Sequence, residues 1–203
     1  MPSKPDSELN PVMHSIAEIR TIARDLDVTH TLHDHANNHR LAAVLVLVYP
    51  GVNGLEILLT KRADHLPTHA GQISFPGGSI DASDPDPVYT ALREAREEVG
   101  LDTDHVEVLG ILEVDLLPSG FAVAPILAVT ESRPSLVPNP EEVDEIFALP
   151  LSLASNLDAY GTDWLERDGV RRDFFTLVFR DYYIWGATAR MLRSLALLLA
   201  KNT

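Results

Sequence analysis

Two apolar runs of strand length, joined by a tight turn, constrain the fold of this chain most strongly. The runs are LAAVLVLVY (41–49) and LEILLTKR (55–62). Asn53 and Gly54 lie between them, and both residue types tolerate the positive φ angles that a two-residue turn needs. The segment therefore predicts a β-hairpin.

The rest of the chain mixes helical and strand-like patterns without a regular strand–helix–strand alternation, which favours an α+β fold. We expect residues 1–39 to form a tail, a helix and a polar connector, and residues 40–203 to form one domain. The spacing of apolar residues predicts helices at 11–26, 87–99 and 187–201, a short acidic helix near 141–147, strands at 106–114, 121–130, 173–179 and 182–186, and a long loop at 63–83.

The charge balance limits the partners of the chain. Its 203 residues include 30 Asp and Glu against 16 Lys and Arg, a formal net charge of −14. Nucleic acids and anionic membranes need a basic surface, so neither is an expected partner. There is no cysteine, no signal-peptide core and no apolar run long enough for a spanning helix. These features predict a cytoplasmic protein.

Three glutamates share one side of the helix expected at 87–99. Glu94, Glu97 and Glu98 fall on one stripe, because residues three and four apart are neighbours on a helix. Like charges at this spacing destabilise a helix, and a hard divalent cation with oxygen ligands would offset the repulsion. The expectation is an exposed carboxylate patch that binds metal; a solvated acidic helix face is the alternative.

The residues around this helix follow a longer motif. After FPGG (75–78) come Asp84 and the run REAREEVGL (93–101). Together they resemble the Nudix box, Gly-x5-Glu-x7-Arg-Glu-U-x-Glu-Glu-x-Gly-U, where U is a bulky aliphatic residue. Asp84 replaces the first Glu of the box, eight residues instead of seven separate it from Arg93, and Ala95 is a small substitute at one U position.

The extra residue in the box, and the segment before it, are similar to one Nudix subgroup, the coenzyme A diphosphatases. Their pattern is Leu-Leu-Thr-x-Arg-Ser/Ala-x3-Arg-x3-Gly-x3-Phe-Pro-Gly-Gly. Here LLTKRA (58–63), Gly71 and FPGG (75–78) are in register, and Pro67 replaces the second Arg. Proline has neither the charge nor the donors of that Arg, so substrate affinity or specificity is expected to differ.

The resemblance implies a Nudix α/β/α sandwich, a mixed sheet between helices with a loop–helix–loop catalytic motif. It implies Mg2+ or Mn2+ as cofactor, with Glu94, Glu97 and Glu98 as metal ligands. Arg93 is expected to orient a box glutamate. The general base stays open between Glu97 and, as less favoured candidates, Glu141 or Glu142.

On the substrate side, the resemblance implies contacts from the segment before the helix. The expected substrate-binding residues are Lys61, Arg62, His69, Gln72, Phe75, Gly77 and Gly78. For Phe75, stacking on a nucleotide competes with simple packing beneath the glycine pair.

The expected reaction is metal-dependent hydrolysis of the pyrophosphate of coenzyme A or its derivatives to 3′,5′-ADP and 4′-phosphopantetheine. Two alternatives are an ADP-ribose or dinucleotide pyrophosphatase and a Nudix domain that only binds a nucleotide. The leucine-rich end LALLLA (195–200) is expected to pack on the sheet or to form a homodimer face.

Overall fold

The computed structural model describes residues 14–27, 32, 38–167 and 169–201. Its centre is a mixed sheet built around β1 (Arg40–Gly51), which carries the first apolar run. β1 pairs antiparallel with β2 (Gly54–Arg62) through the turn expected at Asn53 and Gly54, with Gly51 opposite Gly54, so the hairpin is confirmed. Its other edge pairs in parallel with β7 (Phe121–Val129).

The remaining strands extend this sheet at both ends and fill the gap where β1 and β2 diverge. β5 (Glu107–Ile111) and β6 (Asp115–Leu116) pair with β7. β8 (Val143–Pro150) pairs with β2 and forms the opposite edge. The short strands β3 (Ile73–Ser74) and β4 (Gly77–Ser79) follow one another along the chain and pair with β2 and β1 respectively.

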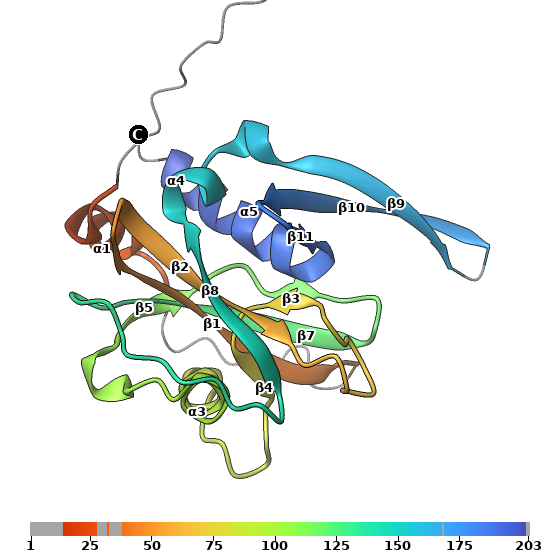
Figure 1. Cartoon of the computed structure of the whole chain (residues 1–203), viewed down its shortest axis with the longest axis horizontal. Coiled ribbons are helices and arrows are strands. Elements are labelled where there is room, and N and C mark those ends of the chain that lie inside the picture. The colour runs from red at the N-terminus through yellow and green to blue at the C-terminus, as the bar shows by residue number, and fades with distance from the viewer. Residues whose placement is uncertain (1–13, 28–31, 33–37, 168, 202–203) are drawn as a thin grey trace, which may run out of the picture.

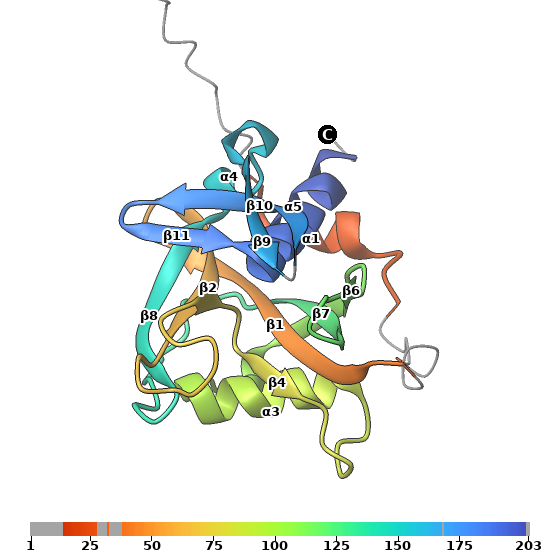
Figure 2. The ribbon, with the colours of Figure 1, turned by 90° about the vertical axis from the view of Figure 1, so that its right-hand side faces the viewer.

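Helices cover the two faces of the sheet (Figures 1 and 2). α3 (Pro87–Val99) packs Ala91, Ala95 and Val99 on one face. On the other face, α5 (Gly186–Ala200) and α1 (Ile16–Ala23) belong to a second core cluster, joined by the four-residue helix α4 (Leu151–Ala154). This arrangement confirms the α+β class and the sheet between helices.

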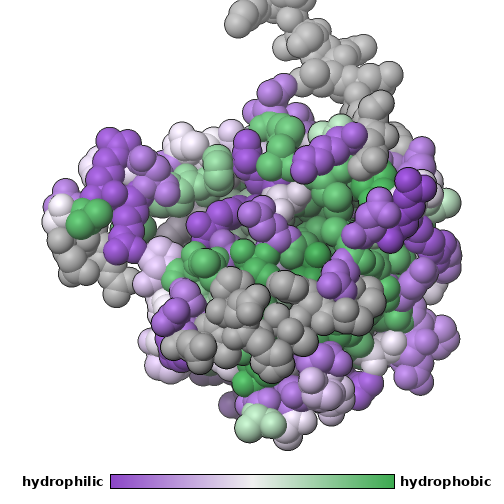
Figure 3. Space-filling view, turned by 180° about the vertical axis from the view of Figure 1, so that it is seen from behind, coloured by the Kyte–Doolittle hydropathy of each residue, from purple (hydrophilic) through white to green (hydrophobic). Residues whose placement is uncertain are grey.

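A separate three-stranded sheet lies above the α5 face. It consists of β9 (Gly161–Arg167), β10 (Val170–Phe179) and β11 (Tyr182–Trp185). The β9–β10 ribbon projects from the body as an arm (Figure 1). In the space-filling view from behind, apolar side chains gather on the body, whereas the arm is mainly hydrophilic (Figure 3). Two 3-10 turns, Thr103–His105 and Leu157–Ala159, complete the described elements.

Several sequence expectations are corrected by the structure. The acidic helix expected near 141–147 is wrong: these residues enter β8, because its alternate residues pack Phe147 and Leu149 into the core while β2 supplies the ladder. The loop expected at 63–83 contains β3 and β4, and β9 was not expected at all. The helix expected at 11–26 runs only from Ile16, where Ser15 caps it, to Ala23; the predicted tail, residues 11–13 and most of the predicted connector lie outside the described residues. The closing helix is confirmed as α5. No described helix has the length and apolar character needed to cross a membrane.

Candidate active site

The ends of α3 set where its glutamates lie. The Asp86 carboxylate accepts a hydrogen bond from the Tyr89 N–H at 2.7 Å, and Pro87 occupies the first turn, where its missing N–H costs nothing. Gly100 ends the helix at φ 63°, a left-handed conformation that glycine adopts without strain, and its N–H donates to the Arg96 carbonyl. The motif helix therefore starts and stops where its sequence indicates.

The three helix glutamates do not form one exposed patch, so that expectation is corrected. Glu98 is only 3% exposed, whereas the side chains of Glu94 and Glu97 are 15% and 53% exposed. Burial raises the pKa of Glu98 to about 8, and the nearby charges of Glu142 and Glu94 act in the same direction. The Gly77 N–H donates to the Glu98 carboxylate and partly opposes this rise.

Arg93 connects the loop before α3 to the carboxylates on it. Its guanidinium lies 3.0 Å from Asp84, 3.0 Å from Glu94 and 2.9 Å from Glu97. The Asp84 side chain is 1% exposed and also accepts a hydrogen bond from the Thr90 hydroxyl at 2.8 Å. Arg93 is the main reason that the pKa of Asp84 is lowered. Arg93 thus orients two box glutamates and holds the loop on the helix.

Gly77 and Gly78 occupy positions where a side chain would collide with neighbouring atoms, of the backbone at Gly77 and of the Glu94 side chain at Gly78. A Cβ atom at Gly77 would fall 2.6 Å from Val44 Cα, and the residue has φ 153°. A Cβ atom at Gly78 would fall 2.6 Å from Glu94 Cδ. The two glycines let β4 lie against β1 on one side and against the carboxylates of α3 on the other.

A fourth carboxylate comes from the segment that precedes β8. Glu142 faces Glu98 and Glu94, since its charge raises the pKa of both. Asn139 fixes this segment: its N–H donates to the Glu98 carbonyl at 2.8 Å and its Nδ2 donates to Glu142 Oε1 at 3.3 Å. The sequence offered Glu142 only as a less favoured base, and the structure brings it into the cluster.

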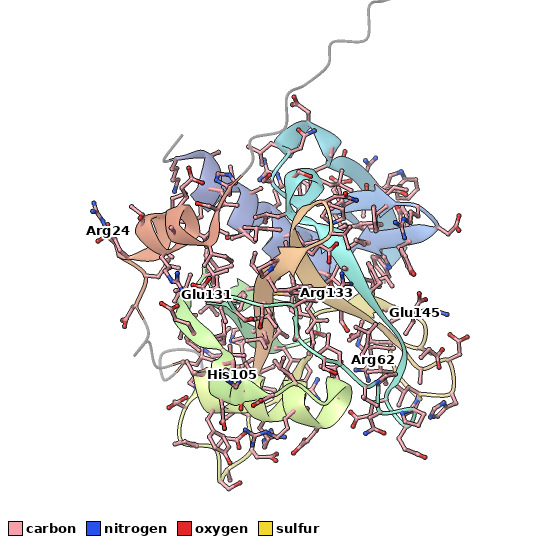
Figure 4. The ribbon with its side chains drawn as sticks, turned by 60° about the vertical axis from the view of Figure 1, so that its left-hand side comes forward. Arg24, Arg62, His105, Glu131, Arg133 and Glu145 are labelled. Carbon is pink, nitrogen blue, oxygen red and sulfur yellow. The ribbon has the colours of Figure 1, made fainter. Side chains whose placement is uncertain are left out.

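Lys61 and Arg62 are the last two residues of β2, and their side chains have different neighbours. The sequence predicted that both contact the substrate. Arg62 lies close enough to Glu98 for its charge to lower the pKa of that group, and its buried Nε has no hydrogen-bond partner among the described residues. Figure 4 shows Arg62 beside α3. Lys61 instead pairs with Asp64 at 3.7 Å and Asp144 at 3.9 Å. Of the two, Arg62 is the one whose charge acts on a box carboxylate.

The loop between β2 and β3 brings His69 and Gln72 together and leads to Phe75, which lies in the core. His69 is exposed at φ 58°, and its Nδ1 is hydrogen-bonded to Gln72 Oε1 at 2.9 Å. Phe75 is 2% exposed and belongs to the core on the α5 face. Its ring is therefore not available for stacking here, and the packing alternative describes its position.

The carboxylates of α3 and Glu142 suit a hard divalent cation, although their side chains do not converge on a single point. Among the described residues, no three acidic or imidazole groups converge closely enough to hold an ion as they stand. Arg93 accounts for part of this, because it holds Glu94 and Glu97 by ion pairs. The charge of Glu142 nevertheless raises the pKa of both Glu94 and Glu98, and carboxylate oxygens are the ligands that Mg2+ and Mn2+ prefer.

Comparison with known proteins decides the family. The family model described as NUDIX domain matches residues 39–170. The chain belongs to the Nudix family. Two relatives, each described as an uncharacterized Nudix hydrolase NudL, come from Yersinia pestis (strain Pestoides F) and Yersinia pseudotuberculosis (serotype O:1b, strain IP 31758). Each is 38% identical over 169 residues, covering 83% of this chain and 84% of the relative.

Among solved structures, a Nudix hydrolase from M. smegmatis, RenU, is similar with a TM-score of 0.47 and 25% identity, over 56% of this chain and 71% of that one. The Nudix assignment confirms the expected fold and identifies the chain as a hydrolase of the Nudix type, a family that generally uses divalent metal ions. Within it, α3 and the segment before it form the Nudix box.

Proposed function

We propose that this Nudix enzyme hydrolyses the pyrophosphate bond of coenzyme A or its derivatives, giving 3′,5′-ADP and 4′-phosphopantetheine. The observation that carries the proposal is the segment 58–78. It matches the pattern of the coenzyme A subgroup at all its named positions except Pro67. Of the matching residues, Gly77 donates its N–H to the buried Glu98 carboxylate, and the charge of Arg62 acts on the same carboxylate.

The residues divide the chemistry between metal binding and substrate binding. Glu94 and Glu98, with Glu97 and Glu142 as further candidates, would hold Mg2+ or Mn2+. A bound ion neutralises pyrophosphate charge and lowers the pKa of the attacking water. Arg62, whose buried Nε has no hydrogen-bond partner among the described residues, supplies a cation for a phosphate oxygen.

The proton acceptor is assigned from exposure and charge. Glu97 has the most exposed carboxylate of the three on α3. Arg93 holds Glu97 at 2.9 Å, so its carboxylate is oriented as well as accessible. We assign Glu97 as the first candidate for the base and Glu142 as the second. The protein is proposed to act in the cytoplasm on a small nucleotide substrate, with Leu197 on the exposed side of α5 available to a homodimer contact.

ADP-ribose or dinucleotide hydrolysis is a second candidate, favoured by Pro67, which removes the second arginine of the subgroup pattern. A domain that only binds nucleotides is less well supported, because all three helix carboxylates are present. The test is a panel of coenzyme A, ADP-ribose, NADH and diadenosine polyphosphates with Mg2+ or Mn2+, with products separated by chromatography. We expect the highest kcat/KM with coenzyme A; a higher value for another member overturns the proposal, and no hydrolysis of any member favours a binding domain.

A further inference from the structure

A groove of about 470 Å3 lies beside β8, outside the cluster of carboxylates. Its walls are the segment 133–138 and the outer side of β8, and its lining includes Tyr49, Arg133, Leu136, Pro138, Ile146 and Ala148. The volume is in the range of small-molecule sites. In Figure 4, Arg133 and Glu145 appear above Arg62, along β8.

The groove exposes the free edge of a sheet. β8 pairs with β2 on one side, and no described strand pairs with its other side. Every second residue of an edge strand turns its N–H and C=O outward, where they are free to bond to an added chain. A ligand that carries its own amide groups in an extended conformation can use this edge in the way that an added peptide strand does.

The charges along the groove disfavour a phosphate group inside it. Arg133 lies at one end, but its Nη1 is 3.6 Å from Glu56 Oε2, so its charge is already partly matched. Asp144 and Glu145 line the other end, where Asp144 pairs with Lys61 at 3.9 Å and Glu145 accepts a hydrogen bond from the Tyr182 hydroxyl. Between these groups the lining is apolar, with Leu136, Ile146 and Ala148. An uncharged ligand with amides and aliphatic carbons fits this combination.

The acidic end of the groove borders the catalytic residues. Pro138 and Asp144 line the groove. Asn139, next to Pro138, donates its N–H to the Glu98 carbonyl, and Glu142, two residues before Asp144, faces the Glu98 carboxylate. A substrate whose pyrophosphate lies at Glu98 can therefore extend directly into the groove.

We propose that this groove binds the pantetheine arm of the substrate, an uncharged extended chain with two secondary amides, along the edge of β8. The arm has the backbone length of about four extended residues, roughly 13 Å, and residues 144–148 of a strand span about the same length. This inference rests on the proposed function, because it places the non-nucleotide half of coenzyme A.

The first experiment fills the groove. Ala148→Trp is expected to lower kcat/KM for coenzyme A at least tenfold more than for ADP-ribose, which also joins adenosine to a pyrophosphate but has neither the 3′-phosphate nor the amide arm. Val52→Trp is the matched control, because Val52 is 82% exposed in the β1–β2 turn and outside the groove. If Ala148→Trp does not fold, the smaller change Ala148→Leu is measured in the same way. Equal losses for both substrates would overturn the proposal.

The second experiment measures binding without turnover. Free pantetheine is titrated into wild-type protein, Ala148→Trp or Ala148→Leu, and Val52→Trp, with binding followed by calorimetry or NMR. We expect Kd to rise at least tenfold only in the Ala148 variants. No binding to wild type, or unchanged binding in the Ala148 variants, contradicts the groove assignment. If pantetheine binds as expected while coenzyme A is not hydrolysed, the groove stands and the proposed reaction fails.

Discussion

The Cα of Gly78 lies directly against the carboxylate of Glu94, so that a Cβ atom added there would sit 2.6 Å from Glu94 Cδ. Gly78 pairs with Ala43 in the β1–β4 ladder, which keeps its backbone from moving away. Any larger residue must therefore displace the Glu94 side chain. The backbone at Gly78 therefore limits where the carboxylate of Glu94, a proposed metal ligand, can lie.

Gly78→Ala is predicted to impair metal use without unfolding the protein. The φ angle of Gly78 lies outside the left-handed region, so alanine adopts the backbone conformation and only Glu94 has to move. We expect a loss of tenfold or more in the apparent affinity for Mg2+ or Mn2+, with a change in stability of about 1 kcal/mol. Metal titrations of activity and thermal unfolding in EDTA measure the two effects.

Gly161→Ala is the matched control, because its Cβ would meet Thr176 in the arm and no carboxylate. Equal metal affinity in Gly78→Ala and wild type would show that Glu94 is not a ligand.

Glu98→Gln is predicted to remove most turnover. The substitution keeps the shape of the side chain and removes the charge of a proposed ligand for a hard cation. We expect kcat to fall by two or more orders of magnitude, equivalent to about 3 kcal/mol of barrier. Steady-state kinetics at saturating metal provide the measurement. Near-normal kcat would exclude Glu98 from the metal site, and Glu166→Gln, at an exposed position on β9, is the control.

The metal-free protein is predicted to lose stability as the pH rises from about 4.5 to about 8. The folded state raises the pKa of Glu98 from its ordinary value of 4.5 to about 8. Over that interval the folded protein holds a proton that the unfolded chain has released, so unfolding becomes easier with each step in pH. Below about pH 4.5 and above about pH 8, Glu98 does not contribute to the dependence of the unfolding free energy on pH.

Urea unfolding in EDTA at several pH values tests this dependence. Glu98→Gln should flatten the profile and be more stable than wild type at pH 8, whereas Glu166→Gln should keep the wild-type slope. Parallel slopes in wild type and Glu98→Gln would contradict the assignment of the titration to Glu98.

Pro67→Arg is predicted to improve kcat/KM for coenzyme A about tenfold, since a charge-assisted hydrogen bond contributes ~1.5–3 kcal/mol. Pro67 is exposed on the loop between β2 and β3, so an arginine fits there without repacking. A smaller gain with dephospho-coenzyme A would assign the contact to the 3′-phosphate. Pro67→Ala separates charge from loop stiffness, because proline restricts the loop. Equal losses in both variants would point to loop shape instead.

Local sequence signals were sufficient for the elements that are defined by nearby residues. The β1–β2 hairpin follows from its turn residues, and α3 follows from Asp86, Pro87 and Gly100 at its ends. The prediction for 141–147 was wrong because its acidic residues suggested the exposed face of a helix. Most of this segment instead forms a strand because it pairs with β2, which is distant in sequence.

The same limit applies to the candidate site. The motif located the box glutamates, but it could not reveal that Glu98 is buried or that Arg93 engages three carboxylates. Burial and convergence depend on β4 and on the segment before β8, which reach α3 only in the folded chain. Glu142 lies near Glu98 because the segment before β8 folds against α3, and helical periodicity could not predict this.

The parallel ladder between β1 and β7, from Arg40 opposite Phe121 to Val48 opposite Val129, also has a consequence during synthesis. The partners are roughly 80 positions apart, so at about 5–20 residues per second a ribosome needs several seconds to deliver β7 after β1. Throughout that delay the nascent chain carries an open apolar strand edge, the kind of surface that pairs with other chains. A chaperone that shields this edge should increase the yield of folded protein, whereas slower translation, which lengthens the delay, should lower it.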